Sequence, residues 1–151
     1  MLSKKSKYGL QALISLAKAP QDSSVLISDL AEEERIPKKF LEAILLELKK
    51  QGILRSKKGK GGGYQLAKHP SQIKLGQVIR ILDGPLAPVS CVSQSAYKRC
   101  EECKDEYRCG IRLVMKEVRD AMANILDNTS LEEMNLRTQN LTEEMSPNYH
   151  I

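Results

Sequence analysis

The 151-residue sequence predicts a mainly α-helical protein, in which a winged helix-turn-helix unit with a β-hairpin wing precedes a long C-terminal dimerisation helix. Three observations lead to this fold. Amphipathic helical patterns occupy most of the chain before residue 52, two short strand-like segments then flank a glycine-rich loop, and a long apolar stripe runs through residues 111–126. The order helix, helix, helix, hairpin is that of a winged helix-turn-helix.

The first two helices are predicted from apolar spacing and from residues that favour helix ends. Residues 8–17 have apolar side chains at helical spacing, and Pro20 ends the pattern. Ser28 precedes a short segment with acidic residues in its first turn, which favours a second helix that starts there.

The third helix is predicted to cover residues 37–51. Pro37 suits the first helical position, and Gly52 offers a left-handed cap after the last turn. One face is apolar, and its predicted members are Phe40, Leu41, Ile44, Leu45 and Leu48.

Strand-like residues 53–56 and 64–67 lie on either side of a loop that carries three lysines and four glycines. We expect a hairpin with a long basic tip. Residues 74–84 form a further amphipathic helix, which Gly84 and Pro85 close.

A stripe of apolar residues then follows the spacing of a long helix. Its members are Ile111, Val114, Met115, Val118, Ala121, Met122, Ile125 and Leu126. So small a chain has little other core to cover this helix, so we expect a second copy to cover it. Packing within the same subunit is the alternative.

The chain is therefore expected to have four segments. Residues 1–84 form the winged helix-turn-helix domain, residues 85–110 a cysteine-containing sensor loop, and residues 111–137 a dimerisation helix region. Residues 138–151 form a polar tail that we expect to be disordered.

Charge is unevenly distributed along the chain. Residues 1–80 contain 16 Lys and Arg against 7 Asp and Glu, a formal net charge of +9, whereas residues 81–151 contain 8 against 12, or −4. The basic half predicts a polyanionic partner, and nucleic acid is favoured because no basic amphipathic membrane helix is present. No apolar run approaches the roughly 18 residues of a membrane span. We expect a soluble, cytoplasmic protein.

Double-stranded DNA is the nucleic acid that this fold binds. Lys38 and Lys39 begin the third helix, where side chains and free amides meet phosphate, and Glu42 can accept a hydrogen bond from a cytosine amino group. The wing lysines are expected to contact phosphates and the wing glycines to let the backbone approach DNA. The predicted DNA-binding residues are Ser28, Lys38, Lys39, Glu42, Lys57, Lys58, Lys60, Gly61, Gly62 and Tyr64. The alternative is a solvated lysine face with a flexible turn.

All four cysteines lie close together in the sequence, and eight, two and five residues separate Cys91, Cys100, Cys103 and Cys109. Thiolates are soft ligands that suit zinc or an iron–sulfur cluster, and clustered cysteines in a reducing cytosol bind metal or do redox chemistry more often than they form structural disulfides. Neighbouring cations are expected to lower the pKa of these thiols. They are Lys98, Arg99, Lys104 and Arg108.

Four interpretations of the thiols stay open: an iron–sulfur cluster, a structural zinc site, metal-free redox chemistry, or no chemistry. A thiol oxidoreductase that uses Cys100 and Cys103 is a different class, but no βαβ pattern surrounds the pair. The sequence also has no phosphate loop, no metalloprotease motif and no Ser, His and Asp set. We do not expect an enzyme.

From about Ser3 to Leu136 the sequence resembles the Rrf-two family of bacterial transcription regulators. The segments that carry the resemblance are YGLQALISLA, LEAILLELKKQGIL, GKGGGYQLAK and LGQVIRILDG, followed by the cysteine loop and the final helix. The resemblance implies a homodimeric winged-helix protein that binds palindromic promoter sites. Several members carry an iron–sulfur cluster that senses iron–sulfur status, nitric oxide or redox state.

The resemblance also implies roles for single residues. Glu42 matches a recognition-helix glutamate that contributes to base choice in the family's iron–sulfur biogenesis regulator. Cluster-binding members use three cysteines in this loop, and Cys91, Cys103 and Cys109 match them. Cys100 is additional, and Arg112 replaces a histidine of that regulator, so ligation by all four cysteines is implied.

Overall fold

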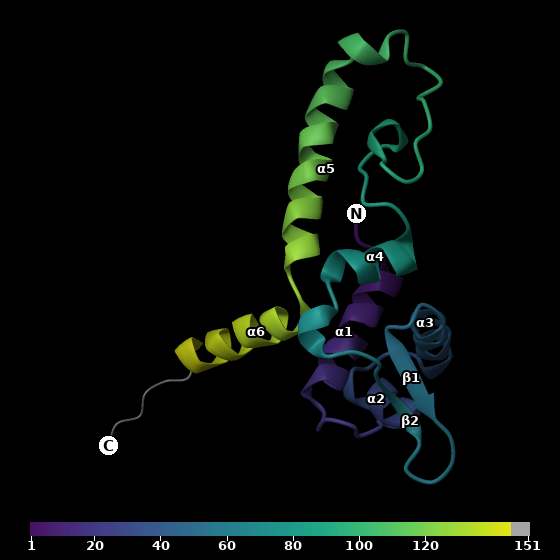
Figure 1. Cartoon of the computed structure of the whole chain (residues 1–151), viewed down its shortest axis with the longest axis vertical. Helices are drawn as coiled ribbons and strands as arrows, with labels where there is room; N and C mark the ends of the chain where they lie inside the picture. Colours follow the sequence, from purple (N-terminus) through teal and green to yellow (C-terminus); the bar gives the residue numbers. More distant parts are fainter. Residues whose placement is uncertain (146–151) are drawn as a thin grey trace.

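The computed structural model describes residues 1–145, which are mostly helical (Figure 1). The elements are α1 (Lys4–Lys18), α2 (Ile27–Glu33), α3 (Lys38–Lys50), β1 (Leu54–Lys57), β2 (Gly63–Leu66), η1 (Pro70–Gln72), α4 (Leu75–Asp83), η2 (Ser90–Val92), η3 (Glu106–Arg108), α5 (Gly110–Asn128) and α6 (Leu131–Met145). The first four helices and the hairpin form one body, and α5 extends from it as a rod beside the cysteine loop, residues 85–109 (Figure 1). The predicted winged helix-turn-helix with a long C-terminal helix is confirmed.

The core of the body lies where α1, α3 and α4 meet the hairpin. Leu13, Leu45, Ile53 and Val78 are fully buried there, and burial of each such side chain contributes about 1.5–3 kcal/mol. Gly9 lets α1 and α4 approach closely, because a Cβ at this position would lie 2.4 Å from Leu82 Cδ1.

The apolar face of α3 is as predicted, with Leu41, Ile44, Leu45 and Leu48 buried. Phe40 is the exception, since it is 42% exposed, and its ring packs edge-to-face with Tyr8 at 5.7 Å between ring centroids. It lies one position outside the buried stripe.

Gly52 ends α3 as predicted. It has a φ of +75° and its amide donates to Lys49 O at 3.0 Å, while Ile53 N–H donates to Leu48 O at 3.0 Å. These two bonds form a Schellman motif, which directs the chain into β1.

The predicted start of α2 is wrong. The helix begins at Ile27 with Leu26 at its N-cap, and no side chain caps it. Ser28 therefore lies within the first turn. The preceding segment is fixed instead by a backbone bridge to the hairpin, in which Val25 N–H donates to Tyr64 O at 2.9 Å and Tyr64 N–H donates to Val25 O at 2.8 Å.

The hairpin strands β1 and β2 pair antiparallel, with Leu54 opposite Leu66 and Lys57 opposite Gly63. The strands lie within one residue of their predicted positions. Together with the Val25–Tyr64 bridge, this pairing fixes the wing to the segment between α1 and α2.

The segment between α5 and α6 returns to the body. Leu75 N–H donates to Thr129 O and Leu131 N–H donates to Ile73 O, both at 3.0 Å. Next to this bridge, Arg80 of α4 forms a two-pronged ion pair with Asp127 of α5, at 2.6 Å and 2.9 Å. We call these contacts the α4–α5 joint.

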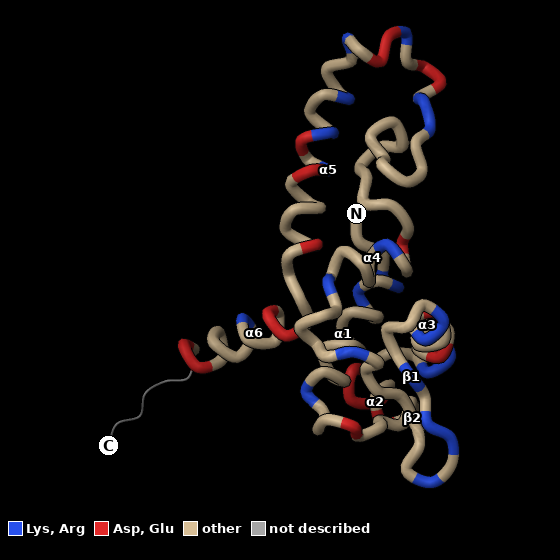
Figure 2. Tube along the Cα trace, viewed as in Figure 1, with Lys and Arg blue, Asp and Glu red and all other residues tan. Residues whose placement is uncertain are grey.

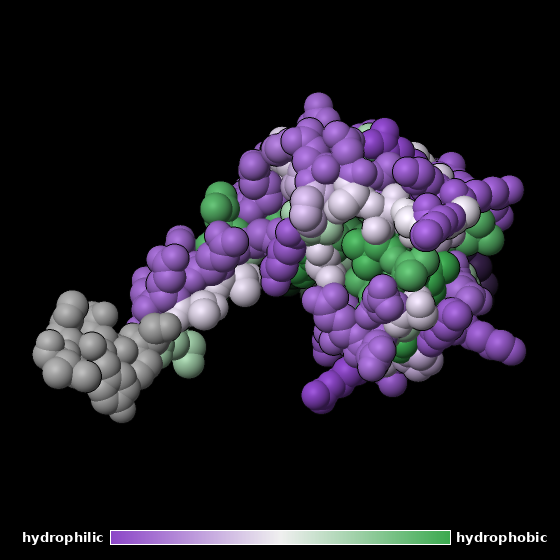
Figure 3. Space-filling model, turned by 90° about the horizontal axis from the view of Figure 1, so that it is seen from below, coloured by the Kyte–Doolittle hydropathy of each residue, from purple (hydrophilic) through white to green (hydrophobic). Residues whose placement is uncertain are grey.

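Residues 138–145 were expected to belong to a disordered tail. They instead continue α6. Ser130 Oγ accepts a hydrogen bond from Glu133 N–H at 3.1 Å, and Arg137 pairs with Glu133 one turn on. These local bonds start the helix, and Leu131 anchors it in the core. Seen from below, α6 projects from the body with mostly hydrophilic side chains on its visible face (Figure 3). The rest of the predicted tail lies outside the described residues.

None of the helices described for residues 1–145 has the length and apolar content of a membrane span.

Candidate nucleic-acid interface and cysteine loop

A cleft of about 340 Å³ opens between α2, the start of α3 and the hairpin. Five of the ten predicted DNA-binding residues line it, and they come from α2, α3 and both strands of the hairpin: Ser28, Lys38, Glu42, Lys57 and Tyr64. The fold therefore brings together residues that are up to 36 positions apart in the sequence.

The start of α3 is suited to an anion. Pro37 is its N-cap residue, no side chain caps the helix, and its first turn contains no acidic residue. Amide groups at such a helix end attract phosphate. Lys38 and Lys39, both exposed, extend from this turn.

The tip of the wing carries the remaining predicted residues. Lys58, Lys60 and Gly61 are exposed, and the basic residues follow the hairpin to its tip (Figure 2). Gly62 is buried instead, and a Cβ there would lie 2.4 Å from Lys57 O. We expected the backbone of Gly62 to be exposed and to approach DNA, but it lies inside the tight turn.

Gly63 was not among the predicted site residues, although it lines the same cleft. It has a φ of +136°, and a Cβ there would lie 2.1 Å from Val25 O. The run of three glycines signals a turn, but the sequence does not show which glycine faces Val25.

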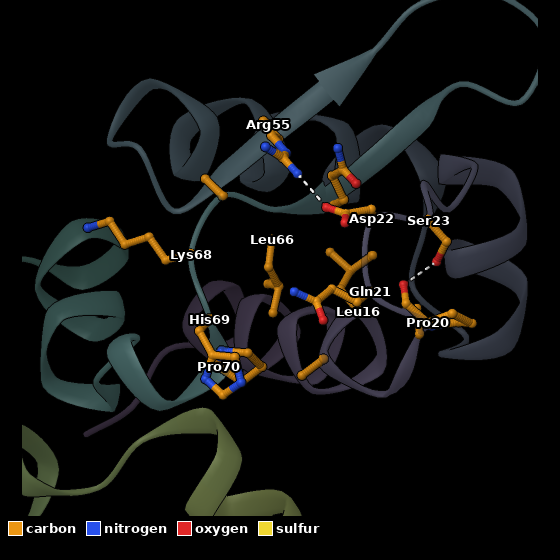
Figure 4. Close-up of a pocket in the computed structure, with 14 residues that line it drawn as sticks. Leu16, Pro20, Gln21, Asp22, Ser23, Arg55, Leu66, Lys68, His69 and Pro70 are labelled. Atoms are coloured by element: carbon orange, nitrogen blue, oxygen red, sulfur yellow. Dashed lines mark hydrogen bonds and ion pairs between the residues drawn. The ribbon is translucent and has the colours of Figure 1, made fainter.

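A second cleft, of about 310 Å³, lies on another side of the hairpin and contains none of the predicted site residues. Arg55 and Asp22, joined by an ion pair at 3.1 Å, border it on one side and His69 and Pro70 on the opposite side (Figure 4).

The two ends of the cysteine loop are held against α5 by arginines. Arg112 Nε donates to Cys91 O at 3.3 Å, and Arg119 Nη1 donates to Val92 O at 2.6 Å. The Arg112 backbone N–H also donates to Cys109 Sγ at 3.4 Å, so Cys109 caps α5 with its sulfur. Arg112 thus contacts both the first and the last cysteine of the loop. The sequence indicated only that it is no metal ligand.

The four thiols do not converge on one point. Among the described residues, no three His, Cys, Asp or Glu side chains are grouped so that they could hold a metal ion. Cys91, Cys103 and Cys109 are half-buried. Cys100 is exposed and donates to Glu102 Oε2 at 3.1 Å, which directs its thiol to a carboxylate instead.

We expected the neighbouring cations to lower the pKa of the thiols. This expectation is wrong for Cys100 and Cys103. The hydrogen bond to Glu102 raises the pKa of Cys100. Desolvation, followed by the charge and hydrogen bond of Cys109, raises the pKa of Cys103, and Arg99 only partly offsets this rise. The hydrogen bond to Glu102 and the desolvation of Cys103 therefore keep both pKa values raised.

Comparison with known proteins gives a consistent likeness over nearly the whole chain. Residues 2–135 match the Rrf2 family model, whose description is iron-dependent transcriptional regulator. An rrf2-like HTH-type transcriptional regulator of Rhodobacter capsulatus is 42% identical over 137 residues, which cover 89% of this chain and 91% of the relative.

Two further relatives have solved structures. The HTH-type transcriptional regulator CymR of Bacillus subtilis is 32% identical over 133 residues, 88% of each chain. The structure of CymR, the global cysteine regulator of B. subtilis, gives a TM-score of 0.75 at 29% identity and covers 91% of this chain and 97% of that chain. The structure of IscR of T. potens gives a TM-score of 0.74 at 27% identity, and the match covers 99% of this chain and 94% of that chain. The likeness includes both the body and α5.

Proposed function

Because the chain belongs to the Rrf2 family of transcriptional regulators, we propose that it is a homodimer that binds a palindromic promoter site and responds to the chemistry of its cysteine loop. The relatives are named as transcriptional regulators, so the chain is a regulator and not an enzyme. Residues 1–84 are the proposed DNA-binding domain, residues 85–110 the sensor and residues 111–137 the dimerisation region.

The observation that carries the DNA proposal is the cleft between α2, α3 and the wing. It contains Lys38 and Lys57, which suit phosphate, and Glu42, which suits the amino group of a base. Lysines and a carboxylate in one cleft suit a DNA groove, which offers both phosphates and base edges.

The wing supplies the remaining phosphate contacts. Lys58 and Lys60 extend from its exposed tip, beside the backbone of Gly61. We assign affinity to these lysines and sequence choice to Glu42, since phosphate contacts fix position and contacts to base edges discriminate sequences.

The surface of α5 supports a dimer. None of its 19 residues is buried within the chain. Its outer side exposes a stripe whose members are Ile111, Val114, Val118, Met122 and Ile125. A two-fold axis along this stripe would present two α3 helices to successive turns of DNA, with half-site centres about one helical turn apart.

The sensor chemistry has two candidates. Metal-free thiol redox chemistry is supported by four free cysteines, which all lie in the segment between α4 and α5. An iron–sulfur cluster is supported by the description of the family as iron-dependent and by the IscR relatives. As the loop is arranged here, the thiols do not fit a four-cysteine cluster or a zinc site, because Cys100 bonds Glu102 and, among the described residues, no three metal-ligating side chains are grouped.

Ligation by all four cysteines would therefore need a different arrangement of the loop. Absorbance spectra with iron, zinc and sulfide analysis on anaerobically purified protein distinguish the candidates. Bound iron with sulfide would favour a cluster and bound zinc a zinc site, whereas a metal-free protein that binds DNA would favour redox chemistry.

The DNA proposal is tested with Lys57→Ala, Lys58→Ala and Lys60→Ala together. The probe is a DNA fragment that the unmutated protein selects from a random library, and affinity is measured from low to high salt. The slope of log affinity against log salt should become shallower by about 0.9 for each phosphate that the variant no longer neutralises.

The control is a triple variant that removes the same charge elsewhere, Lys4→Ala, Lys7→Ala and Lys116→Ala. It should leave the salt slope close to that of the unmutated protein. Equal slopes for both triple variants would refute the wing assignment. Glu42→Ala should change the ranking of operator variants, and a uniform loss for every sequence would count against its role in base choice.

A further inference from the structure

One straight stripe of exposed residues runs along the side of α3 that faces away from the core. Its members follow the spacing i, i+4, i+7 and i+11, which keeps residues on one side of a helix. They are Lys39, Ala43, Leu46 and Lys50. We call them the α3 stripe. The buried residues of the helix, Leu41, Ile44, Leu45 and Leu48, lie on the opposite side.

Leu46 is a large apolar residue in the middle of the α3 stripe. It is 45% exposed and is not among the buried residues of the helix. Phe40, the other large apolar residue exposed on α3, packs edge-to-face with Tyr8 of α1. Phe40 therefore belongs to the contact between α1 and α3, whereas Leu46 lies on the side of α3 that faces solvent.

The charges at the two ends of the α3 stripe suit the major groove of DNA. Lys39 and Lys50 are about 16 Å apart along the helix axis, and the major groove is about 12 Å wide. Phosphates border this groove, so both lysines can reach a phosphate while the residues between them lie over the base edges. The apolar middle of the stripe then faces the bases.

Glu42 is the carboxylate of α3 that lies beside the stripe. The other carboxylate of the helix, Glu47, is half-buried and pairs with Lys5 of α1 at 2.5 Å. Glu42 is exposed, lines the cleft between α2, α3 and the wing, and comes one helical turn before Leu46. Four residues of a helix advance about 6 Å, and successive base pairs are about 3.4 Å apart. Contacts by these two side chains would therefore fall at most two base pairs apart.

We propose that Leu46 contacts the C5-methyl group of a thymine in the major groove, at most two base pairs from the base that Glu42 contacts. Thymine is the base of unmodified DNA that presents a methyl group there, and apolar side chains recognise it by direct contact. Leu46 is then a second specificity-determining residue of α3. It selects an A·T pair, whereas Glu42 selects a G·C pair through the amino group of cytosine.

This inference deepens the proposed function and rests on it, since α3 must enter the major groove for Leu46 to meet a base. It adds an apolar determinant of sequence to the polar one. The lysines of the stripe and of the wing cannot supply that determinant, because phosphate contacts are the same for every sequence.

The test uses the full chain and the DNA fragment that the unmutated protein selects from a random library. Each thymine of a half-site is replaced in turn by deoxyuridine, which lacks only the C5-methyl group. Replacement of the contacted thymine should weaken binding about fourfold, which is the cost of removing one methyl group from an apolar contact.

Leu46→Ala should weaken binding of the unmodified DNA by about tenfold or more. The same deoxyuridine should then cost less than about twofold, because the partner of the methyl group is gone. Leu46→Met keeps a large apolar side chain and should keep the response to deoxyuridine. Position 46 is exposed and alanine favours a helix, so both variants should fold, and circular dichroism checks this.

Leu136→Ala is the matched control, since Leu136 is 53% exposed on α6. It should match the unmutated protein in affinity and in its response to every deoxyuridine. Sedimentation of the Leu46→Ala protein should show the same assembly as the unmutated protein. A change in assembly would make Leu46 a contact between protein chains and would overturn the proposal.

Two results with DNA would also overturn it. One is a set of deoxyuridine responses that is the same for the unmutated protein and Leu46→Ala at every thymine. The other is a selected half-site with no thymine within two base pairs of the position whose preference changes in Glu42→Ala.

Failure of this inference is distinguishable from failure of the proposed function. An unmutated protein that selects no DNA would refute both. Selective binding, with a shallower salt slope for the wing variant but no coupling between Leu46 and a methyl group, would refute this inference alone.

Discussion

Gly63 is the residue on which the attachment of the wing depends. Its φ of +136° belongs to a region that residues with a Cβ rarely adopt, and its backbone contacts Val25 O directly. The bridge between Val25 and Tyr64 requires that approach. A side chain at this position would therefore strain the backbone and separate the wing from the segment before α2.

Gly63→Ala should lower the free energy of unfolding by about 3 kcal/mol or more, because backbone strain adds to a steric clash. Gly61→Ala is the matched control, since Gly61 also has a positive φ, +74°, but open space around it. Its cost should be about 1–2 kcal/mol. Urea unfolding of both variants measures the difference, and equal costs would contradict the role assigned to Val25 O.

Arg112 is a second single residue, and its contact with Cys91 could not be predicted from the sequence. Its position three residues after Cys109 is readable from the sequence, and so is its inability to ligate metal. Its bond to Cys91 O depends on how residues 92–108 fold back along α5, because 21 positions separate the partners. Contacts of this kind follow from tertiary structure and have no local pattern.

At the scale of the elements, the α4–α5 joint connects the body to the rod. Asp127 Oδ1 lies only 2.0 Å from where a Cβ of Gly76 would be, so the ion pair with Arg80 fits because position 76 is glycine. The hydrogen bond from Arg80 lowers the pKa of Asp127. Both partners are more than one-third exposed, so solvent screening limits the pair to about 0.5–1 kcal/mol.

Gly76→Ala tests this joint in two backgrounds. In the unmutated protein the new methyl group displaces Asp127. The loss of the ion pair offsets the gain in stability of about 1 kcal/mol that alanine brings to a helix relative to glycine. In Asp127→Ala the methyl has room, so the same substitution should be about 1–2 kcal/mol more favourable. Thermal unfolding gives both values. Gly110→Ala, which meets open space, should have the same effect in both backgrounds.

The joint also predicts a dependence on pH. The folded-state pKa of Asp127 is below its unfolded value, so the pair stabilises the fold above roughly pH 4 and loses this contribution as pH falls through the lower, folded-state pKa. Asp127→Asn should therefore be less stable than the unmutated protein at pH 7. The gap should close toward pH 3 in urea unfolding, and a gap that widens there would contradict the assignment.

At the scale of the whole molecule, α5 has two different sides. Arg112, Met115, Arg119, Ala123 and Leu126 are its half-buried residues, on the side that packs against α4 and η2. Met115 and Leu126, predicted as members of the apolar stripe, thus belong to the inner side. The exposed stripe lies next to it and has no cover within the described chain.

Val118→Glu with Met122→Glu should weaken the dimer by about 100-fold or more, because burial of two charges in an apolar interface is costly. Sedimentation across a concentration series measures the change. Leu113→Glu is the matched control, since Leu113 is 66% exposed on another side of α5. Monomeric unmutated protein at micromolar concentration, with and without DNA, would overturn the dimer.

The order of the elements was predictable because local patterns define it. The buried face of α3 and the cap at Gly52 follow directly from residue spacing. The predictions that failed concern competition between local signals and distant partners. Ser28 resembles a helix cap, yet α2 begins at Ile27 and its N-cap is Leu26, two positions before Ser28 and next to the bridge from Val25 to Tyr64.

The candidate site divides in the same way. Lysines and glycines of the wing are evident from composition, whereas the division of labour among three successive glycines depends on which backbone atoms face each one. The surroundings of the thiols were equally hidden. The sequence groups Cys100 with Cys103, but the structure shows that the sulfur of Cys100 bonds Glu102.

The amino terminus is attached to the part of the molecule from which the sensor loop departs. Ser3 N–H donates to Asp83 Oδ2 at 3.0 Å, and the hydroxyl of Ser3 bonds the same carboxylate. Asp83 is the last residue of α4, immediately before the chain enters the loop. A purification tag or fluorophore placed before Ser3 would therefore perturb the root of the loop, and reporters for solution studies belong beyond the exposed far end of α6 instead (Figure 1).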